Sequence, residues 1–129
     1  MNQKNLKTLG ELESEIMEII WANGEAPVRL VLNELKKIRG IAYTTVMTVM
    51  VRLHDKKILT RKMDKSGAFV YAPVLDKKTF LAKASEKIIK NFLAEYGDIA
   101  VAQFVDLIEA GDSKQSKEWK SKLKNMLNQ

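Results

Sequence analysis

The sequence has no cysteine and only one histidine, His54, among its 129 residues. Without cysteine there is no disulfide, no thiolate metal site and no cysteine nucleophile. One histidine and no tight group of carboxylates do not provide a catalytic triad, a zinc site or a histidine-based pH switch. The six glycines are scattered and form no phosphate-binding loop. We therefore expect neither an enzyme nor a bound metal or cofactor, and we expect His54 at the surface.

Long apolar runs are missing as well. No stretch is long enough to cross a membrane, and the N-terminal sequence lacks the apolar segment of a secretory signal. Hydrophobic residues make up 46% of the chain, as in an ordinary folded protein. We therefore expect a cytoplasmic protein with one domain or two very small ones.

Positive charge is unevenly distributed along the chain, whose net charge is +6. Between Lys36 and Lys65 there are nine basic and two acidic residues, a local net charge of +7, so the remainder sums to about −1. A concentrated basic segment indicates binding to the phosphates of DNA or RNA. The simpler alternative is a solvated basic surface, and a third interpretation is a module that binds an acidic protein.

The segment Ala42–Lys57 predicts an amphipathic helix with two chemically different sides. Its apolar side, at helical spacing, consists of Val46, Val49, Met50 and Leu53. Its polar side consists of Thr44, Thr45, Thr48 and Arg52, with Met47 and Val51 beside them. Threonine is β-branched and a weak helix former, so a helix that starts with several of them suggests a use in recognition. The alternative is that they only cap and solvate the helix start.

The segments around this helix predict a winged helix-turn-helix domain. A helix is expected at about residues 9–22, with Thr8 and Glu11 in a capping box. After the extended link Glu25–Pro27, an apolar stripe that ends at Ile38 predicts a second helix to about Lys37. Two strands, 58–64 and 68–73, then form a hairpin around the turn at 65–67. The fold class is thus mostly α, with a small β-hairpin wing.

This arrangement predicts which residues contact DNA. In helix-turn-helix proteins the N-terminal part of the recognition helix faces base edges. Threonine hydroxyls can bind bases or phosphates and their methyl groups can contact thymine methyls, while Arg52 suits a phosphate or a guanine. The predicted DNA-binding residues are Tyr43, Thr44, Thr45, Met47, Thr48 and Arg52 on the helix, with Arg61, Lys62 and Lys65 on the wing.

Beyond a boundary at residues 73–76 the sequence predicts three more helices. The first begins with Asp76 as a candidate N-cap, the second spans 99–110, and the third begins at Ser113 or Ser116. We therefore predict a winged-helix domain at 1–75 and a helical dimerisation domain at 76–129. About 54 residues are too few to bury their large side chains alone, which favours a homodimer. The alternative is that these helices fold back on the first domain. The predicted dimerisation residues are Phe80, Leu81, Ala84, Ile88, Phe92, Tyr96, Phe104 and Leu123.

Several motifs resemble those of a known family. They are Leu9–Glu13 with Ile16-Met17 and Ile20-Trp21, then Ala42–Val49 with Arg52-Leu53, then Tyr71–Pro73, and more loosely Val101–Asp106. In these the chain resembles the penicillinase-repressor family of the BlaI/MecI type over nearly its whole length.

The resemblance implies a homodimeric winged-helix repressor that binds palindromic operators with TACA/TGTA-like half-sites and controls resistance or stress genes. It also implies release by proteolysis after a membrane-bound zinc-peptidase sensor detects a β-lactam, with that sensor or a downstream protease as a partner. The matching bond is Gln103-Phe104, where characterised members usually carry asparagine before the phenylalanine. A copper-responsive branch uses a cysteine pair that this chain lacks.

A regulator that responds to a small ligand is the alternative within the same fold. Trp21, Phe69 and Phe92 would then line a pocket between the head and the dimerisation domain, unless they belong to the core. In that interpretation the protein is not controlled by cleavage.

Overall fold

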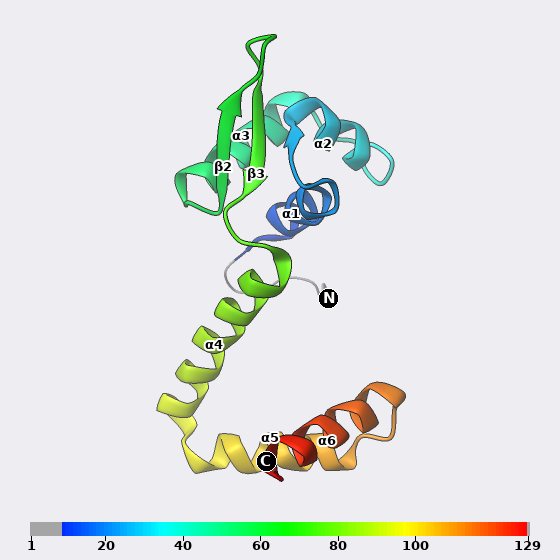
Figure 1. Cartoon of the computed structure of the whole chain (residues 1–129), viewed down its shortest axis with the longest axis vertical. Coiled ribbons are helices and arrows are strands. Elements are labelled where there is room, and N and C mark those ends of the chain that lie inside the picture. Colours follow the sequence, from blue (N-terminus) through cyan, green and yellow to red (C-terminus); the bar gives the residue numbers. More distant parts are fainter. Residues whose placement is uncertain (1–8, 129) are drawn as a thin grey trace. The chain divides into compact units, whose positions relative to one another are not determined.

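The computed structural model describes residues 9–128. Three helices, α1 (Glu11–Asn23), α2 (Val28–Leu35) and α3 (Tyr43–Asp55), precede a hairpin of β2 (Leu59–Met63) and β3 (Phe69–Pro73) (Figure 1). A short strand, β1 (Ala26–Pro27), lies between α1 and α2, and three helices follow the hairpin: α4 (Lys77–Tyr96), α5 (Asp98–Ala110) and α6 (Lys114–Leu127). The predicted fold class, mostly α with a small β-hairpin wing, is confirmed.

The described residues form two compact units, and the division lies inside α4. One unit ends at Ala84 and the other begins at Ser85. We call residues 9–84 the head and residues 85–128 the C-terminal unit. The domain boundary predicted from the sequence lay at the start of α4, whereas the first turns of this helix belong to the head.

The core of the head is built from the apolar sides of α1, α2 and α3 with two residues of the hairpin. All four residues predicted on the apolar side of α3 are at most 7% exposed, which confirms that assignment. Leu59 and Tyr71 close the core from the sheet. Burying these side chains is the main stabilising contribution, and it fixes α3 in rotation, so its polar side must face outward.

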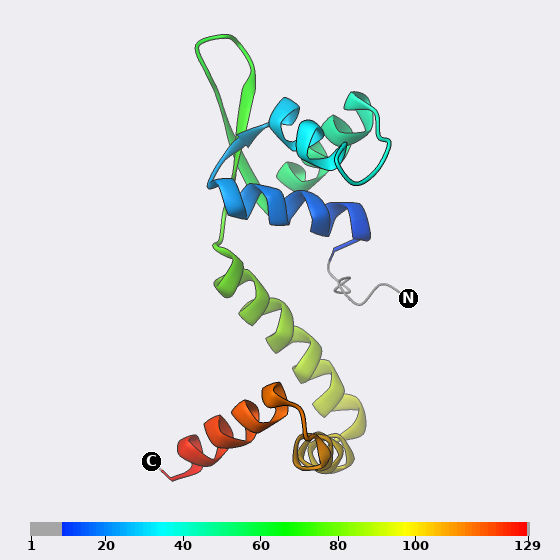
Figure 2. The same ribbon diagram turned by 90° about the vertical axis from the view of Figure 1, so that its right-hand side faces the viewer.

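A three-stranded antiparallel sheet in the order β1-β3-β2 borders this core. Ala26 pairs with Tyr71 and Pro27 with Val70, while β2 pairs with β3 from Leu59–Pro73 to Met63–Phe69. The predicted link Glu25–Pro27 therefore contains a strand, which the sequence pattern did not reveal. Figure 2 shows the β2–β3 hairpin extending past the helices of the head, as a wing.

Two details at the ends of helices differ from the prediction. At the start of α1 the Gly10 N–H donates to Glu13 Oε1 at 2.9 Å, while Thr8 of the predicted capping box lies outside the described residues. Helix α2 ends at Leu35, so Ile38 does not continue its apolar stripe and is 69% exposed.

The start of α4 is held on the head by an aromatic contact and a hydrogen bond. The Thr79 N–H donates to the Asp76 carboxylate at 2.7 Å, which confirms Asp76 as the N-cap. The ring of Phe80 lies 5.4 Å from that of Trp21, and Trp21 Nε1 donates to the Leu75 carbonyl at 3.0 Å. Phe80 therefore packs within the head of its own chain.

In the C-terminal unit, α5 and α6 are in contact but bury no side chain fully. Of the two candidates for the cap of α6, Ser113 is the N-cap: its hydroxyl accepts from the Ser116 N–H at 3.1 Å. Helix α5 carries large apolar side chains around most of its circumference, and Ile99, Phe104 and Leu107 are 76%, 58% and 65% exposed. A helix of this kind is normally covered on several sides.

Candidate nucleic-acid interface

The outer side of α3 is exposed and its hydroxyl groups are free. Tyr43, Thr44, Thr45, Thr48 and Arg52 are all exposed, as predicted. The helix is capped by the Ala42 carbonyl, which accepts from the N–H groups of residues 45 and 46, and no side chain caps it. Within residues 9–128 none of the three threonine hydroxyls makes a hydrogen bond. The threonines are therefore not needed to cap the helix and remain available to a ligand.

Ion pairs divide the basic residues of the head into two groups. Lys37 pairs with Glu34, Arg39 with Glu11 and Glu15, Lys56 with Glu13, and Lys77 with Glu18. Among the ion pairs of the described residues, none includes the other nine basic residues of the head: Arg29, Lys36, Arg52, Lys57, Arg61, Lys62, Lys65, Lys78 and Lys83. Seven of these nine cations belong to α2 and its C-cap, α3 and the turn that follows it, and the wing, a concentration that suits binding to a phosphate backbone.

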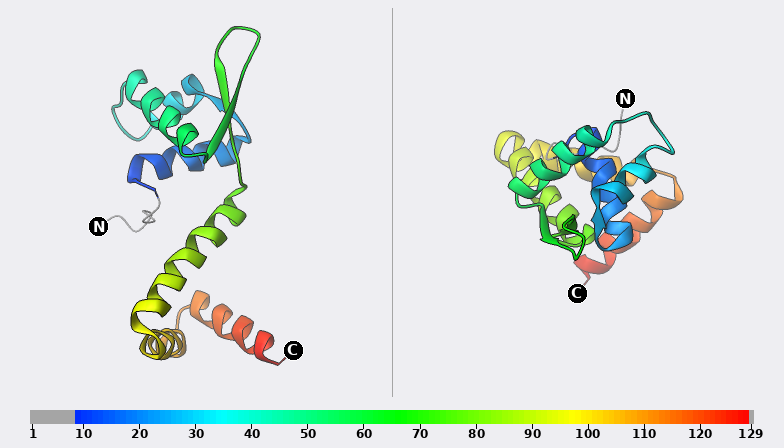
Figure 3. Two further views of the ribbon diagram at one scale, coloured as in Figure 1. Left: turned by 90° about the vertical axis from the view of Figure 1, so that its left-hand side faces the viewer. Right: turned by 90° about the horizontal axis from the view of Figure 1, so that it is seen from above.

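The wing presents two different faces. In a strand successive side chains alternate between faces, so Arg61 shares the side of Leu59 while Lys62 points to the other. Arg61 is half-buried: its guanidinium carbon lies 4.1 Å from the centre of the Phe69 ring, and its Nη1 donates to the Tyr71 hydroxyl at 3.3 Å. Lys62 and Lys65 are exposed. Arg61 therefore stiffens the wing, and the two lysines are the freer cations. The left view of Figure 3 shows the backbone of this hairpin extending past the helices of the head.

The tip of the wing is a tight turn built on Asp64. Its carboxylate accepts from the N–H groups of Ser66 at 2.8 Å and Ala68 at 3.1 Å and from the Ser66 hydroxyl at 2.6 Å. These bonds, led by the one from the hydroxyl, hold the pKa of Asp64 below its ordinary value. Gly67 adopts φ +88°, a conformation that favours glycine. Because the turn is fixed by its own residues, Lys65 is presented on a defined loop.

A buried carboxylate, that of Glu13, holds the C-terminal end of α3 against α1. Glu13 accepts from the Gly10 N–H and from Lys56 Nζ, both at 2.9 Å. Burial alone would raise the pKa of Glu13, but the hydrogen bond from Gly10 and the charges of Lys56 and Arg52 bring the pKa below its ordinary value. The pair joins the N-terminus of α1 to the C-terminus of α3, so it fixes the far end of the exposed helix.

One basic residue at this surface was missed by the sequence-based prediction. The Arg29 guanidinium carbon lies 5.6 Å from the centre of the Tyr43 ring, so α2 also contributes to the surface. Arg29 precedes the charged segment that begins at Lys36, and the net charge of that segment does not include it. The signal that would have found it is its place on the part of α2 that the buried Val28 and Val31 leave exposed.

The other predicted residues lie apart from this surface. His54 is one-third exposed, with Nδ1 3.5 Å from Asp55 Oδ1. Trp21 contacts Phe80 and Phe69 contacts Arg61, both within the head, while Phe92 belongs to the C-terminal unit. Within residues 9–128 there is no group of three or more side chains suited to a metal ion, and no helix long and apolar enough to span a membrane.

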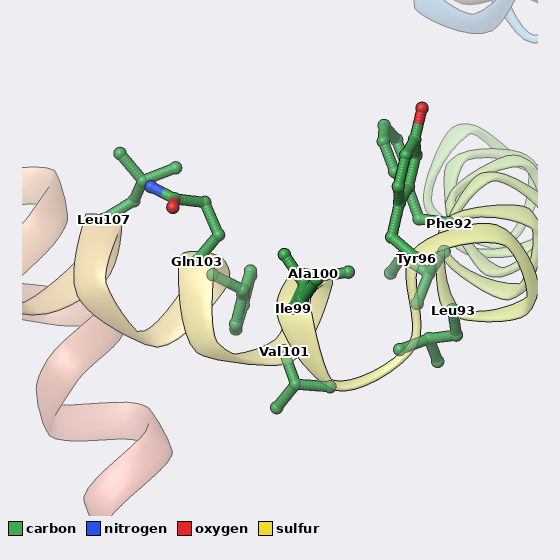
Figure 4. Close-up of a pocket in the computed structure, with 10 residues that line it drawn as sticks. Phe92, Leu93, Tyr96, Ile99, Ala100, Val101, Gln103 and Leu107 are labelled. Atoms are coloured by element: carbon green, nitrogen blue, oxygen red, sulfur yellow. The ribbon is translucent and has the colours of Figure 1, made fainter.

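An apolar cavity of about 660 Å³ lies in the C-terminal unit, between the end of α4 and one side of α5 (Figure 4). Phe92, Tyr96 and Phe104 of the predicted dimerisation set line it, and so does Gln103, which forms the predicted cleavage bond with Phe104. The rest of that set does not line the cavity: Phe80 packs on Trp21, Leu81, Ile88 and Leu123 are half-buried, and Ala84 is buried.

The helix-turn-helix, the projecting wing and the free polar side of α3 define a winged-helix protein of the DNA-binding class. Comparison with known proteins agrees. The family model of the penicillinase repressor matches residues 9–129. The transcriptional regulator BlaI of Mycobacterium tuberculosis is 40% identical over 114 residues, 84% of this chain and 79% of BlaI. The penicillinase repressor of Bacillus licheniformis is 26% identical over 89 residues, 69% of each chain.

Among solved structures, the monomeric form of Bacillus licheniformis BlaI in complex with the blaP half-operator has a TM-score of 0.48 at 28% identity. The match covers 59% of this chain and 92% of that one. The chain belongs to the penicillinase repressor family. It is a BlaI-type transcriptional repressor with a winged-helix DNA-binding domain, and it is not an enzyme.

Proposed function

We propose that the protein is a homodimeric repressor that binds a palindromic operator with TACA/TGTA-like half-sites and controls genes of the response to β-lactams. The observation that carries the proposal is the outer side of α3, which is exposed and whose three threonine hydroxyls make no hydrogen bond within residues 9–128. Beside it lie cations such as Arg52, Lys62 and Lys65, which have no carboxylate partner among the same residues. In this arrangement Thr44, Thr45 and Thr48 read base edges in the major groove, while Lys62 and Lys65 of the wing bind phosphates.

Titration of two DNA duplexes of equal length tests the DNA-binding part. One contains two inverted half-sites and the other is scrambled. We expect the palindromic duplex to bind more tightly and its affinity to fall steeply with salt. The double substitution Thr45→Ala, Arg52→Ala should weaken operator binding by about 1–3 kcal/mol for each base-contacting side chain that it removes. Equal affinity for both duplexes, or normal operator protection by the double variant, would contradict sequence-specific binding through α3.

The exposed apolar residues of the C-terminal unit support dimerisation. Phe92, Tyr96, Phe104 and Leu107 are each at least 49% exposed and lie around one cavity. Apolar patches of this kind mark interfaces, and a second copy would cover them with matching residues through a two-fold axis. Two linked heads would then bind both half-sites of a palindrome at once.

Release by cleavage at Gln103-Phe104 is the proposed control, with a membrane-bound sensor or a downstream protease as the partner. Both residues lie within the helical turns of α5, so a protease reaches the bond only when this helix opens locally. Mass spectrometry of the repressor recovered from β-lactam-treated cells tests the proposal, with a fragment that ends at Gln103 as the expected product. Intact repressor under induction would contradict it.

The cavity also makes it possible to test the alternative function, a regulator that responds to a small ligand. Its volume lies in the range of small-molecule sites, about 300–1,000 Å³. A thermal-shift screen of the dimer distinguishes the two: a compound that both stabilises the protein and releases the operator supports ligand control. If the second copy fills the cavity, no compound should do so.

A further inference from the structure

A guanidinium and an aromatic ring from two helices meet at the N-terminal end of α3. Arg29 is the second residue of α2 and Tyr43 is the first residue of α3. The guanidinium carbon lies 5.6 Å from the ring centre, which is the distance of a cation–π contact. Both side chains are exposed, Tyr43 to 41%, so the pair belongs to the surface and not to the core.

Arg29 has no carboxylate partner among the ion pairs of residues 9–128. The guanidinium lies over the ring of Tyr43, and such a contact leaves N–H donors of the planar group available to a ligand. The ring also limits the positions of a long side chain, so less conformational entropy is lost when those donors bind a ligand. Arg29 is thus a pre-oriented donor group that lacks an acceptor.

The exposed side of α2 extends the same chemistry. The buried residues of this helix, Val28, Val31, Leu32 and Leu35, lie on one side. Arg29, Asn33 and Lys36 follow each other at helical spacing next to this buried side, and all three are exposed. This polar stripe has a positive charge at each end, and α2 packs directly against α3.

We propose that Arg29 binds a phosphate of the DNA backbone and that Tyr43 positions its guanidinium, an inference that rests on the proposed DNA-binding function. The planar fork of the guanidinium suits two oxygens of one phosphate. The ring of Tyr43 holds this fork in place, and its hydroxyl donates to the same backbone. Phosphate contacts fix the register of a protein on DNA without reading sequence. Arg29 therefore contributes to affinity and orientation, while the threonines of α3 select the sequence.

The test compares variants of the full chain by fluorescence anisotropy over a range of salt concentrations, with the palindromic and the scrambled duplex. Arg29→Gln should reduce the slope of log affinity against log salt by about 0.9, the value for one phosphate. Because this contribution vanishes near 1 M salt, the loss at about 0.1 M is about eightfold, and it should be equal for both duplexes. Arg29→Lys should keep the slope but lose part of the affinity, because an ammonium has no planar fork.

Lys77→Gln is the matched control, since it removes the same charge from an ion pair with Glu18 at the start of α4. It should leave the slope unchanged. Tyr43→Phe keeps the ring and should also keep the slope. Tyr43→Ala removes the ring, and its effect should not add to that of Arg29→Gln in the double variant, because both substitutions disrupt the same coupled pair.

An unchanged salt slope in a folded Arg29→Gln variant, checked by its circular dichroism melt, would overturn the inference. A loss confined to the palindromic duplex would also overturn it, because that result means a base contact. Additive effects of Tyr43→Ala and Arg29→Gln would refute the positioning role. If the wild-type protein binds neither duplex, the proposed function fails as well. A wild type that binds normally beside an unaffected Arg29→Gln variant disproves only this inference.

Discussion

Replacing Glu13 by glutamine should destabilise the head in a pH-dependent way. Glu13 is 9% exposed and accepts two hydrogen bonds of 2.9 Å, one of them from the ammonium of Lys56. Glutamine keeps the volume and an acceptor for the Gly10 N–H but loses the charge. Hydrogen bonds to charged groups contribute about 1.5–3 kcal/mol to stability. Because the Lys56 ammonium would be hydrated again in the variant, part of this is recovered, and we expect the free energy of unfolding to fall by about 1–2 kcal/mol at neutral pH.

The pH dependence follows from the depressed pKa of Glu13. Burial opposes ionisation, but the Gly10 N–H and the Lys56 ammonium favour it more strongly, so the pKa in the folded state lies below its ordinary value of 4.5. A group whose pKa is lowered by folding stabilises the protein at pH values above its unfolded pKa. This stabilisation is lost as the pH falls from about 4.5 through the lower value of the folded state. The deficit of Glu13→Gln should therefore be complete at neutral pH and shrink under acid conditions.

Urea unfolding followed by circular dichroism at a series of pH values provides the measurement. Glu18→Gln is the matched control, because Glu18 also lies on α1 and pairs with a lysine at 2.9 Å, but on the surface. Exposed ion pairs contribute little to stability, so the free energy of unfolding of this variant should differ from that of the wild type by less than about 1 kcal/mol. Equal losses in both variants, or a Glu13→Gln deficit that persists in acid, would show that the buried pair does not stabilise the head as argued.

Three further substitutions test other parts of the molecule. In Gly67→Ala the added methyl group would meet no atom within 4 Å, but alanine would have to adopt φ +88°. This conformation costs about 1–2 kcal/mol for a residue with a Cβ atom, so the melting temperature should fall, and an unchanged melting temperature would contradict this reasoning. Leu107→Asp places a charge on the exposed patch and should shift sedimentation from dimer to monomer, whereas a persistent dimer would place the interface elsewhere. Ser113→Ala removes the cap of α6 and should reduce its stability by about 1 kcal/mol, seen as a weaker helical signal on heating; full retention of that signal argues against the cap.

The sequence predicted most of the head because its helices bury one side. The spacing of Val46, Val49, Met50 and Leu53 fixed both the helix and its rotation, and with them the exposed threonines. Strand β1 was not predictable in this way, since two residues cannot display an alternating pattern and their partners on β3 lie far along the chain.

Contacts between elements account for the other differences. The stripe from Phe80 to Tyr96 is continuous in sequence, yet Phe80 packs on Trp21 whereas Phe92 lines the cavity of the C-terminal unit. A periodic pattern identifies an apolar side but not the surface that covers it. The contact of Arg29 with Tyr43 joins α2 to α3 and has no local signature either. Arg61 was correctly placed on the wing, but its stacking on Phe69 depends on the register of the hairpin.

The alternation of side chains along the wing has a consequence for how such repressors diverge. Leu59 and Arg61 on one side maintain the hairpin, while Lys62 lies on the opposite side and is exposed. Substitutions of Lys62 or Lys65 should therefore change the free energy of unfolding little, whereas substitutions of Arg61 should lower it. During evolution a duplicated copy of this gene can therefore change its affinity for DNA by single substitutions at Lys62 or Lys65. None of the variants along the way needs to lose its folded structure.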